Sequence, residues 1–150
     1  MALTPSNVNE EKPWLQYYPE WTTHSLEYGD HTLRDLYLNN LSKNVSRIAT
    51  RFFGRTQTFG ELDREVRRAA AGLKAFGVRP GDRVAIMLPN CPQHVAAFFA
   101  VQLIGGVVVE HNPLYTAHEL RPQFLDHGAR VAIAWDKAAD TLEQLRARTA

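Results

Sequence analysis

The apolar positions after residue 30 switch between two spacings. Leu62, Val66, Ala70 and Leu73 recur at three- and four-residue intervals, which predicts one buried face of an amphipathic helix. Short, nearly continuous apolar runs separate such helices, as is typical of parallel strands covered on both faces. The pattern predicts an α/β fold with a doubly wound, mainly parallel sheet and helices on both faces. The expected strands are 83–88, 107–109 and 131–134.

Most predicted helices carry a start and a stop signal. Thr58 with Glu61 and Thr116 with Glu119 have the S/T-x-x-E form of a capping box, in which hydroxyl and carboxylate satisfy two backbone donors. Glycine just past the last apolar position predicts a helix end. We therefore expect helices that begin at Thr32, Thr58, Asn90, Thr116 and either Asp136 or Asp140, with ends at Gly77, Gly105-Gly106 and Gly128.

Two segments differ from this alternation. Two short β segments at 48–53 and 56–58 predict a hairpin that turns at Gly54-Arg55. Residues 1–30 lack a sustained period, which predicts an extended arm before an α/β portion over 31–150. The arm is rich in aromatic rings, which are expected to dock on this chain, on a partner subunit or on a domain outside this sequence. A homodimer through the arm would use Trp14, Tyr17, Tyr18 and Trp21.

Composition narrows the classes of protein and the compartment. The chain has 150 residues, and 17 Lys+Arg against 16 Asp+Glu give a net charge of +1, so nucleic acid is not expected as a partner. Its one cysteine, Cys91, fits a reducing compartment. No secretory signal is visible in residues 1–10, and the apolar stretch 95–109 is too short to span a membrane. We expect a cytoplasmic protein, with peripheral membrane association left open.

Motifs for self-contained chemistry are absent from the sequence. Neither G-x-G-x-x-G after a strand nor the P-loop pattern occurs, and no G-x-S-x-G or H-E-x-x-H is present. Cys91 begins a helix but has no histidine or asparagine placed by sequence to serve it. Glu110-His111 are neighbours on a strand and so should face opposite sides, and Asp126-His127 would need tertiary partners. We therefore assign no catalytic, cofactor-binding or metal residue.

Several sequence blocks nevertheless resemble those of a known enzyme superfamily. TFGEL at 58–62, AAGL at 70–73, GVRPGDRVA at 77–85 and LPN at 88–90 resemble the opening of acyl-adenylating enzymes. GGVVV at 105–109 and NPLYT at 112–116 resemble the fatty acyl-CoA ligases within that superfamily, and the start of the arm resembles long-chain fatty acid:CoA ligases. The blocks occur in family order over nearly the whole chain.

The resemblance implies an activity that this segment cannot complete. Such ligases use ATP to convert a fatty acid to an acyl-adenylate and then transfer the acyl group to CoA, with Mg²⁺ implied. The phosphate loop, the nucleotide contacts and the catalytic lysine lie later in these enzymes, so the resemblance implies an incomplete sheet and a segment that is inactive alone. A ligase for an aromatic or short-chain acid and a noncatalytic interaction module remain alternatives. The matching positions are assigned structural roles as caps and turns: Thr58, Glu61, Thr116, Glu119, Gly77, Pro80, Gly81, Asn112 and Pro113.

Overall fold

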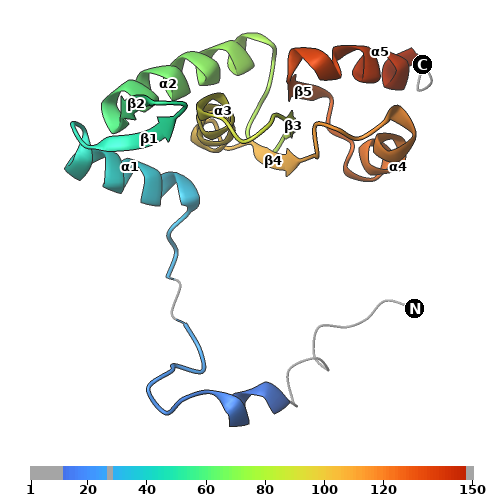
Figure 1. Ribbon diagram of the computed structural model, residues 1–150. Coiled ribbons are helices and arrows are strands. Elements are labelled where there is room, and N and C mark those ends of the chain that lie inside the picture. Colours follow the sequence, from blue (N-terminus) through green and yellow to red (C-terminus); the bar gives the residue numbers. More distant parts are fainter. Residues whose placement is uncertain (1–11, 27–28, 148–150) are drawn as a thin grey trace. The chain divides into compact units, whose positions relative to one another are not determined.

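A computed structural model describes residues 12–26 and 29–147 (Figure 1). The chain divides into two compact units, Met1–His31 and Thr32–Ala150. In the first unit, a short 3₁₀ helix, η2 (Pro13–Tyr17), interrupts the expected extended arm. The rings of Tyr17 and Trp21 are 81% and 85% exposed. Within the described residues of this unit, these two rings are therefore largely open to solvent.

The second unit begins with two helices and a hairpin. Helix α1 (Leu33–Asn44) precedes strands β1 (Ile48–Phe52) and β2 (Arg55–Thr58), which pair antiparallel, and helix α2 (Phe59–Ala75) follows. The hairpin is confirmed, but its turn is Phe53-Gly54, one residue earlier than expected, because Phe52 pairs with Arg55. Both turn residues have positive φ, 45° and 79°, as a two-residue type I′ turn requires.

A three-stranded parallel sheet forms the centre of this unit. Strands β3 (Arg83–Met87), β4 (Val107–Glu110) and β5 (Val131–Ala134) lie in the order β4-β3-β5. The predicted strands are confirmed to within one residue at each end. Four successive residues of β3, from Val84 to Met87, have no exposed surface. The continuous apolar run of β3 therefore reflects burial on both faces.

The remaining helices cover the two faces of the sheet. Helix α3 (Pro92–Leu103) joins β3 to β4, and α4 (Ala117–His127) joins β4 to β5. The 3₁₀ turn η3 (Asp136–Ala138) and α5 (Ala139–Ala147) come last. Figure 1 shows α2 and α3 on one side of the strands and α4 and α5 on the other. From β3 the chain goes to β4 at one edge of the sheet and then returns past β3 to β5 at the other edge. Right-handed crossovers in these two opposite directions place α3 and α4 on opposite faces.

Two hydrophobic clusters fill the space between helices and sheet. The larger unites α1, α2 and α3 with one face of the strands and includes Val66, Val84 and Val101. The smaller lies under α4 and α5 and includes Met87 and Leu120. Since Val84 and Met87 come from the same central strand, β3 joins the two clusters.

Tyr37 attaches α1 to the larger cluster. It is buried, and its ring stacks on Phe99 at a centroid distance of 4.4 Å. Its hydroxyl donates to Asp63 Oδ1 at 3.1 Å, and Asp63 Oδ2 also accepts from Arg67 Nε at 2.7 Å. Burial and the neighbouring Asp63 carboxylate raise the pKa of Tyr37, so the phenol stays a neutral donor. One side chain thus links three helices.

Three helices begin with the same cap. In each, a threonine hydroxyl accepts from the backbone N–H three residues later, at 3.2, 3.2 and 3.4 Å. The acidic side chain at that position accepts from the threonine N–H at 2.9, 2.8 and 2.8 Å. These reciprocal bonds satisfy donors that a helix start otherwise leaves open. The pairs are Thr32–Asp35, Thr58–Glu61 and Thr116–Glu119.

Two predicted helix starts are corrected by the structure. Helix α3 is capped at Cys91 instead of Asn90, because Pro92 takes the first helical position, where its fixed φ and missing N–H are tolerated. Helix α5 begins at Ala139, so Asp140 lies inside its first turn, while Asp136 opens the preceding η3.

The predicted turns and helix ends are confirmed by backbone geometry. Gly77, Gly81 and Gly128 have positive φ of 87°, 87° and 64°. Asp82 donates its N–H to the Arg79 carbonyl at 3.0 Å, and with positive φ at Gly81 this closes a type II turn. This connector lies at the amino end of β3.

We predict that Thr116→Ala destabilises the fold without affecting chemistry. Loss of the hydroxyl removes the acceptor for the Glu119 N–H, which should lower the free energy of unfolding by about 1 kcal/mol. Differential scanning calorimetry of the whole protein should show a lower Tm, and Thr116→Ser should restore it. An unchanged Tm with a lost reaction rate would contradict the structural role.

Two glycine-to-alanine variants should have opposite effects on stability. A Cβ at Gly106 would lie 2.9 Å from Val101 Cγ1 and 3.3 Å from the Asp82 carbonyl oxygen, so Gly106→Ala should cost roughly 1–3 kcal/mol by overpacking. Gly72 lies within α2 with no atom within 4 Å of such a Cβ, so Gly72→Ala should stabilise by about 0.5–1 kcal/mol. Urea unfolding midpoints measure both, and shifts of the same sign would refute the packing argument.

Candidate functional site

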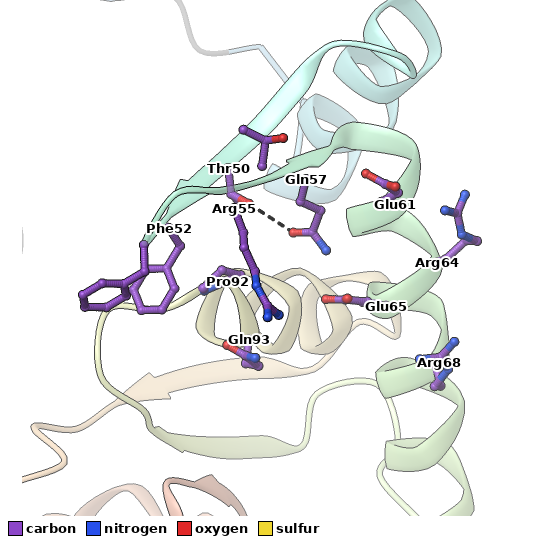
Figure 2. Close-up of a pocket in the computed structure, with 12 residues that line it drawn as sticks. Thr50, Phe52, Arg55, Gln57, Glu61, Arg64, Glu65, Arg68, Pro92 and Gln93 are labelled. Carbon is purple, nitrogen blue, oxygen red and sulfur yellow. Dashed lines mark hydrogen bonds between the residues drawn. The ribbon is translucent and has the colours of Figure 1, made fainter.

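A groove of about 590 Å³ lies between the hairpin, α2 and the start of α3 (Figure 2). Its floor and walls combine Phe52 and Pro92 with polar side chains from β2 and α2. Figure 2 shows the Arg55 side chain extending from the hairpin toward the start of α3. Thr50 Oγ1 donates to Gln57 Oε1 at 3.1 Å across the two strands. The groove is thus an open polar surface beside the hairpin.

Charges of both signs line this groove, but one of its two carboxylates already accepts the capping hydrogen bonds of α2. Arg64 and Arg68 of α2 line it together with Glu61 and Glu65. Hydrogen bonds from the Thr58 backbone N–H and hydroxyl lower the pKa of Glu61. Because this carboxylate stays ionised and accepts the cap bonds, it serves the helix start and not proton transfer.

The tip of the hairpin presents two phenylalanines. Phe53 is 91% exposed and has a φ of 45°, a left-handed conformation that costs an ordinary residue about 1–2 kcal/mol. Its ring meets that of Phe52 edge to face at a centroid distance of 4.6 Å. The turn therefore combines backbone strain with an exposed apolar ring.

The segments after β3 and β4 carry a second polar group. His94 Nε2 lies 3.0 Å from Glu110 Oε1, so the start of α3 is joined to the last residue of β4. Cys91 and His94 line a neighbouring pocket of about 430 Å³. Sequence spacing left Cys91 without a partner, and the fold places His94 in the same pocket. In the part of the chain that the structure describes, no hydrogen bond joins the thiol to the imidazole, which is engaged by Glu110.

A third polar group lies on the opposite side of β4. His111, buried to 7% exposure, has Nδ1 3.0 Å from Gln123 Oε1 and Nε2 3.0 Å from His127 Nε2. Glu110 therefore meets α3 while His111 meets α4, as strand alternation predicted. The His111–His127 contact was not foreseen, since the two residues are 16 positions apart and no local spacing indicates it.

Across residues 12–26 and 29–147, no cluster of three or more His, Cys, Asp or Glu side chains could hold a metal ion. In the same residues, no helix is both long and apolar enough to cross a membrane. The prediction that no residue here is catalytic, binds a cofactor or binds a metal stays a prediction.

Comparisons with known proteins match this architecture. The sequence model of the family described as "AMP-binding enzyme" matches residues 39–150. The long-chain-fatty-acid–CoA ligase of Bacillus subtilis (strain 168) is 39% identical over 129 residues, which are 86% of this chain and 23% of that protein. The 4-coumarate–CoA ligase 2 of Oryza sativa subsp. japonica is 41% identical over 91 residues, 61% of this chain and 16% of that protein.

A solved structure shows the same fold. The crystal structure of the anthranilate CoA ligase AuaEII in complex with anthranoyl-AMP superposes with a TM-score of 0.73 at 26% identity, covering 78% of this chain and 23% of that one. The present chain spans about a quarter of the length of the curated relatives it matches. Because the family match extends over most of the α/β unit and the fold agrees, the chain belongs to the AMP-binding enzyme family.

Proposed function

We propose that this chain is the N-terminal part of an ATP-dependent fatty acid–CoA ligase, an enzyme of lipid metabolism. The observation that carries the proposal is the 39% identity to the long-chain ligase of B. subtilis over 86% of the chain. In the proposed reaction, the fatty acid carboxylate attacks the α-phosphorus of ATP and pyrophosphate leaves. The CoA thiol then attacks the acyl carbon, and AMP leaves as the thioester forms.

In this proposal the present segment acts as a scaffold. Phosphoryl transfer requires positioned charge around the reacting group, and the motifs that supply it in the resembling ligases lie later in their sequences. The residues that bind fatty acid, ATP, CoA and Mg²⁺ are expected outside this segment, which alone should be inactive. We further propose a cytoplasmic location with peripheral contact to membranes, where long-chain acids partition.

A ligase for an aromatic acid is the second candidate. It is favoured by the 41% identity to a 4-coumarate–CoA ligase, although this match covers less of the chain. It is also favoured by the superposition on an anthranilate ligase. The two candidates share the fold and the reaction and differ in the acid.

An acid panel distinguishes the two candidates. We expect the whole protein to release AMP with ATP, CoA and palmitate at a kcat/KM at least about tenfold above that for 4-coumarate, a difference of about 1.4 kcal/mol in transition-state stabilisation. The reverse order would support the aromatic candidate. Absence of AMP release with every acid tested would contradict both and favour a noncatalytic interaction module.

The aromatic arm is proposed as a homodimer contact. Exposed aromatic rings are enriched at protein interfaces, and the arm presents Trp14, Tyr17, Tyr18 and Trp21 at its surface. Deletion of residues 1–30 from the whole protein should convert a dimer to a monomer in light scattering. A second variant, with the four rings replaced by serine, separates the rings from the length of the arm. An unchanged mass in both variants would remove the proposal.

A further inference from the structure

A row of hydrogen bonds joins α4, the start of the loop after β4 and the turn before β5. It runs from the Ala129 N–H to His127 Nδ1 at 3.0 Å, from His127 Nε2 to His111 Nε2 at 3.0 Å, and from His111 Nδ1 to Gln123 Oε1 at 3.0 Å. The His111 ring also stacks on Phe124 at a centroid distance of 4.9 Å. Neither the fold nor the proposed ligase reaction explains why two imidazoles should meet here.

The backbone fixes the direction of the row at one end. A backbone N–H can only donate, so His127 Nδ1, which faces the Ala129 N–H, must carry a lone pair. A neutral imidazole has one protonated nitrogen, so the proton of His127 is on Nε2. His127 therefore donates toward His111.

A side-chain amide fixes the direction at the other end. Gln123 Nε2 donates to the Glu119 carbonyl oxygen at 3.0 Å, which orients the amide so that Oε1 faces His111. This oxygen can only accept, so His111 Nδ1 carries a proton and His111 Nε2 carries the lone pair. The two independent assignments agree at the central contact, where His127 Nε2–H donates to His111 Nε2.

The row leaves no place for an extra proton or for a metal ion. A proton added to His127 would go on Nδ1, where it would face the Ala129 N–H, donor against donor. A proton added to His111 would go on Nε2 and face the His127 Nε2–H. A metal ion bound by both Nε2 atoms would move the proton of His127 to Nδ1 and create the first conflict again. The geometry is consistent only with two neutral rings.

We propose that His111 and His127 form a proton-sensitive latch, which is closed while both rings are neutral and opens when the pair takes up one proton. The closed latch holds the end of α4 and the turn at Gly128–Ala129 to the residue that follows β4. Opening frees the Ala129 N–H and the last turn of α4. The helices α2 and α3 contribute no residue to the row, so opening should leave that side of the sheet unchanged. This inference does not depend on the proposed ligase reaction.

Burial, more than the surrounding charges, favours the neutral form of His127 that the closed latch requires. Burial and then the neighbouring His111 lower the pKa of His127. Asp126 of α4 acts in the opposite direction, and Arg83 of β3 makes the smallest contribution, which again lowers it. An unfolded histidine titrates near 6.5, so the opened or unfolded chain binds more protons than the closed one below that pH. The stability of the latch is therefore complete above about pH 6.5 and falls as the pH drops from there toward the lowered pKa.

Tautomer detection on the unaltered protein tests the assignment directly. In long-range ¹⁵N–¹H spectra of ¹⁵N-histidine-labelled whole protein at about pH 7.5, we expect His127 protonated on Nε2 and His111 protonated on Nδ1, both uncharged. Either latch histidine charged at this pH, or found in the opposite tautomer, would overturn the proposal. So would a zinc-induced shift of both Nε2 signals.

Hydrogen exchange tests the opening. After correction for intrinsic rates, the protection of the peptide that contains the Ala129 amide should fall by up to about fivefold between about pH 6.5 and 5.5, as linkage to the uptake of one proton by a ring that titrates near 6.5 in the open form requires. His118→Gln, the matched control, should keep this dependence, and the double variant His111→Gln/His127→Gln should lose it. Protection independent of pH in the unaltered protein, or the same dependence in the double variant, would refute the latch. If the double variant does not fold, the tautomer measurement decides.

Discussion

The burial of β3 on both faces is the constraint on which the rest of the fold depends. Four successive residues of this strand have no contact with solvent, so each face must be covered by helices that pack at the same time. The larger cluster, under α2 and α3, and the smaller one, under α4 and α5, both include side chains of β3. A substitution on one face of β3 should therefore also affect the packing of the cluster on the other face.

Short connections made with few residue types hold the helices in place around this strand. The three threonine capping boxes start α1, α2 and α4, and glycines with positive φ follow α2, α3 and α4. Gly106 has a different role, since its backbone passes close to Val101 and Asp82 and leaves no room for a side chain. Together, these caps and glycines set where each helix begins and ends, and so bring the following strand alongside β3.

The residues that carry the resemblance to CoA ligases have structural roles in this fold. Thr58 with Glu61 and Thr116 with Glu119 form capping boxes, and Gly77 and Gly81 have positive φ in the connector before β3. Two further polar pairs join helices to this part of the sheet. His94 with Glu110 joins α3 to β4, and His111 with His127 joins the residue after β4 to the end of α4. The second pair is the one whose donors and acceptors are fixed at both ends, which is why it supports an inference about protonation.

The sequence by itself determined the order of the elements, the strand positions and two of the capping boxes. These features depend on periodicity, on β-branched runs and on residues three positions apart, all of which are local. The turn at Phe53-Gly54 and the cap at Cys91 were shifted by one residue, because strand pairing and the position of Pro92 decided them. Only the tertiary structure brought His111 to His127 and His94 to Glu110, since each pair joins residues 16 positions apart. Such contacts depend on how helices pack on a shared strand, and no local spacing encodes that packing.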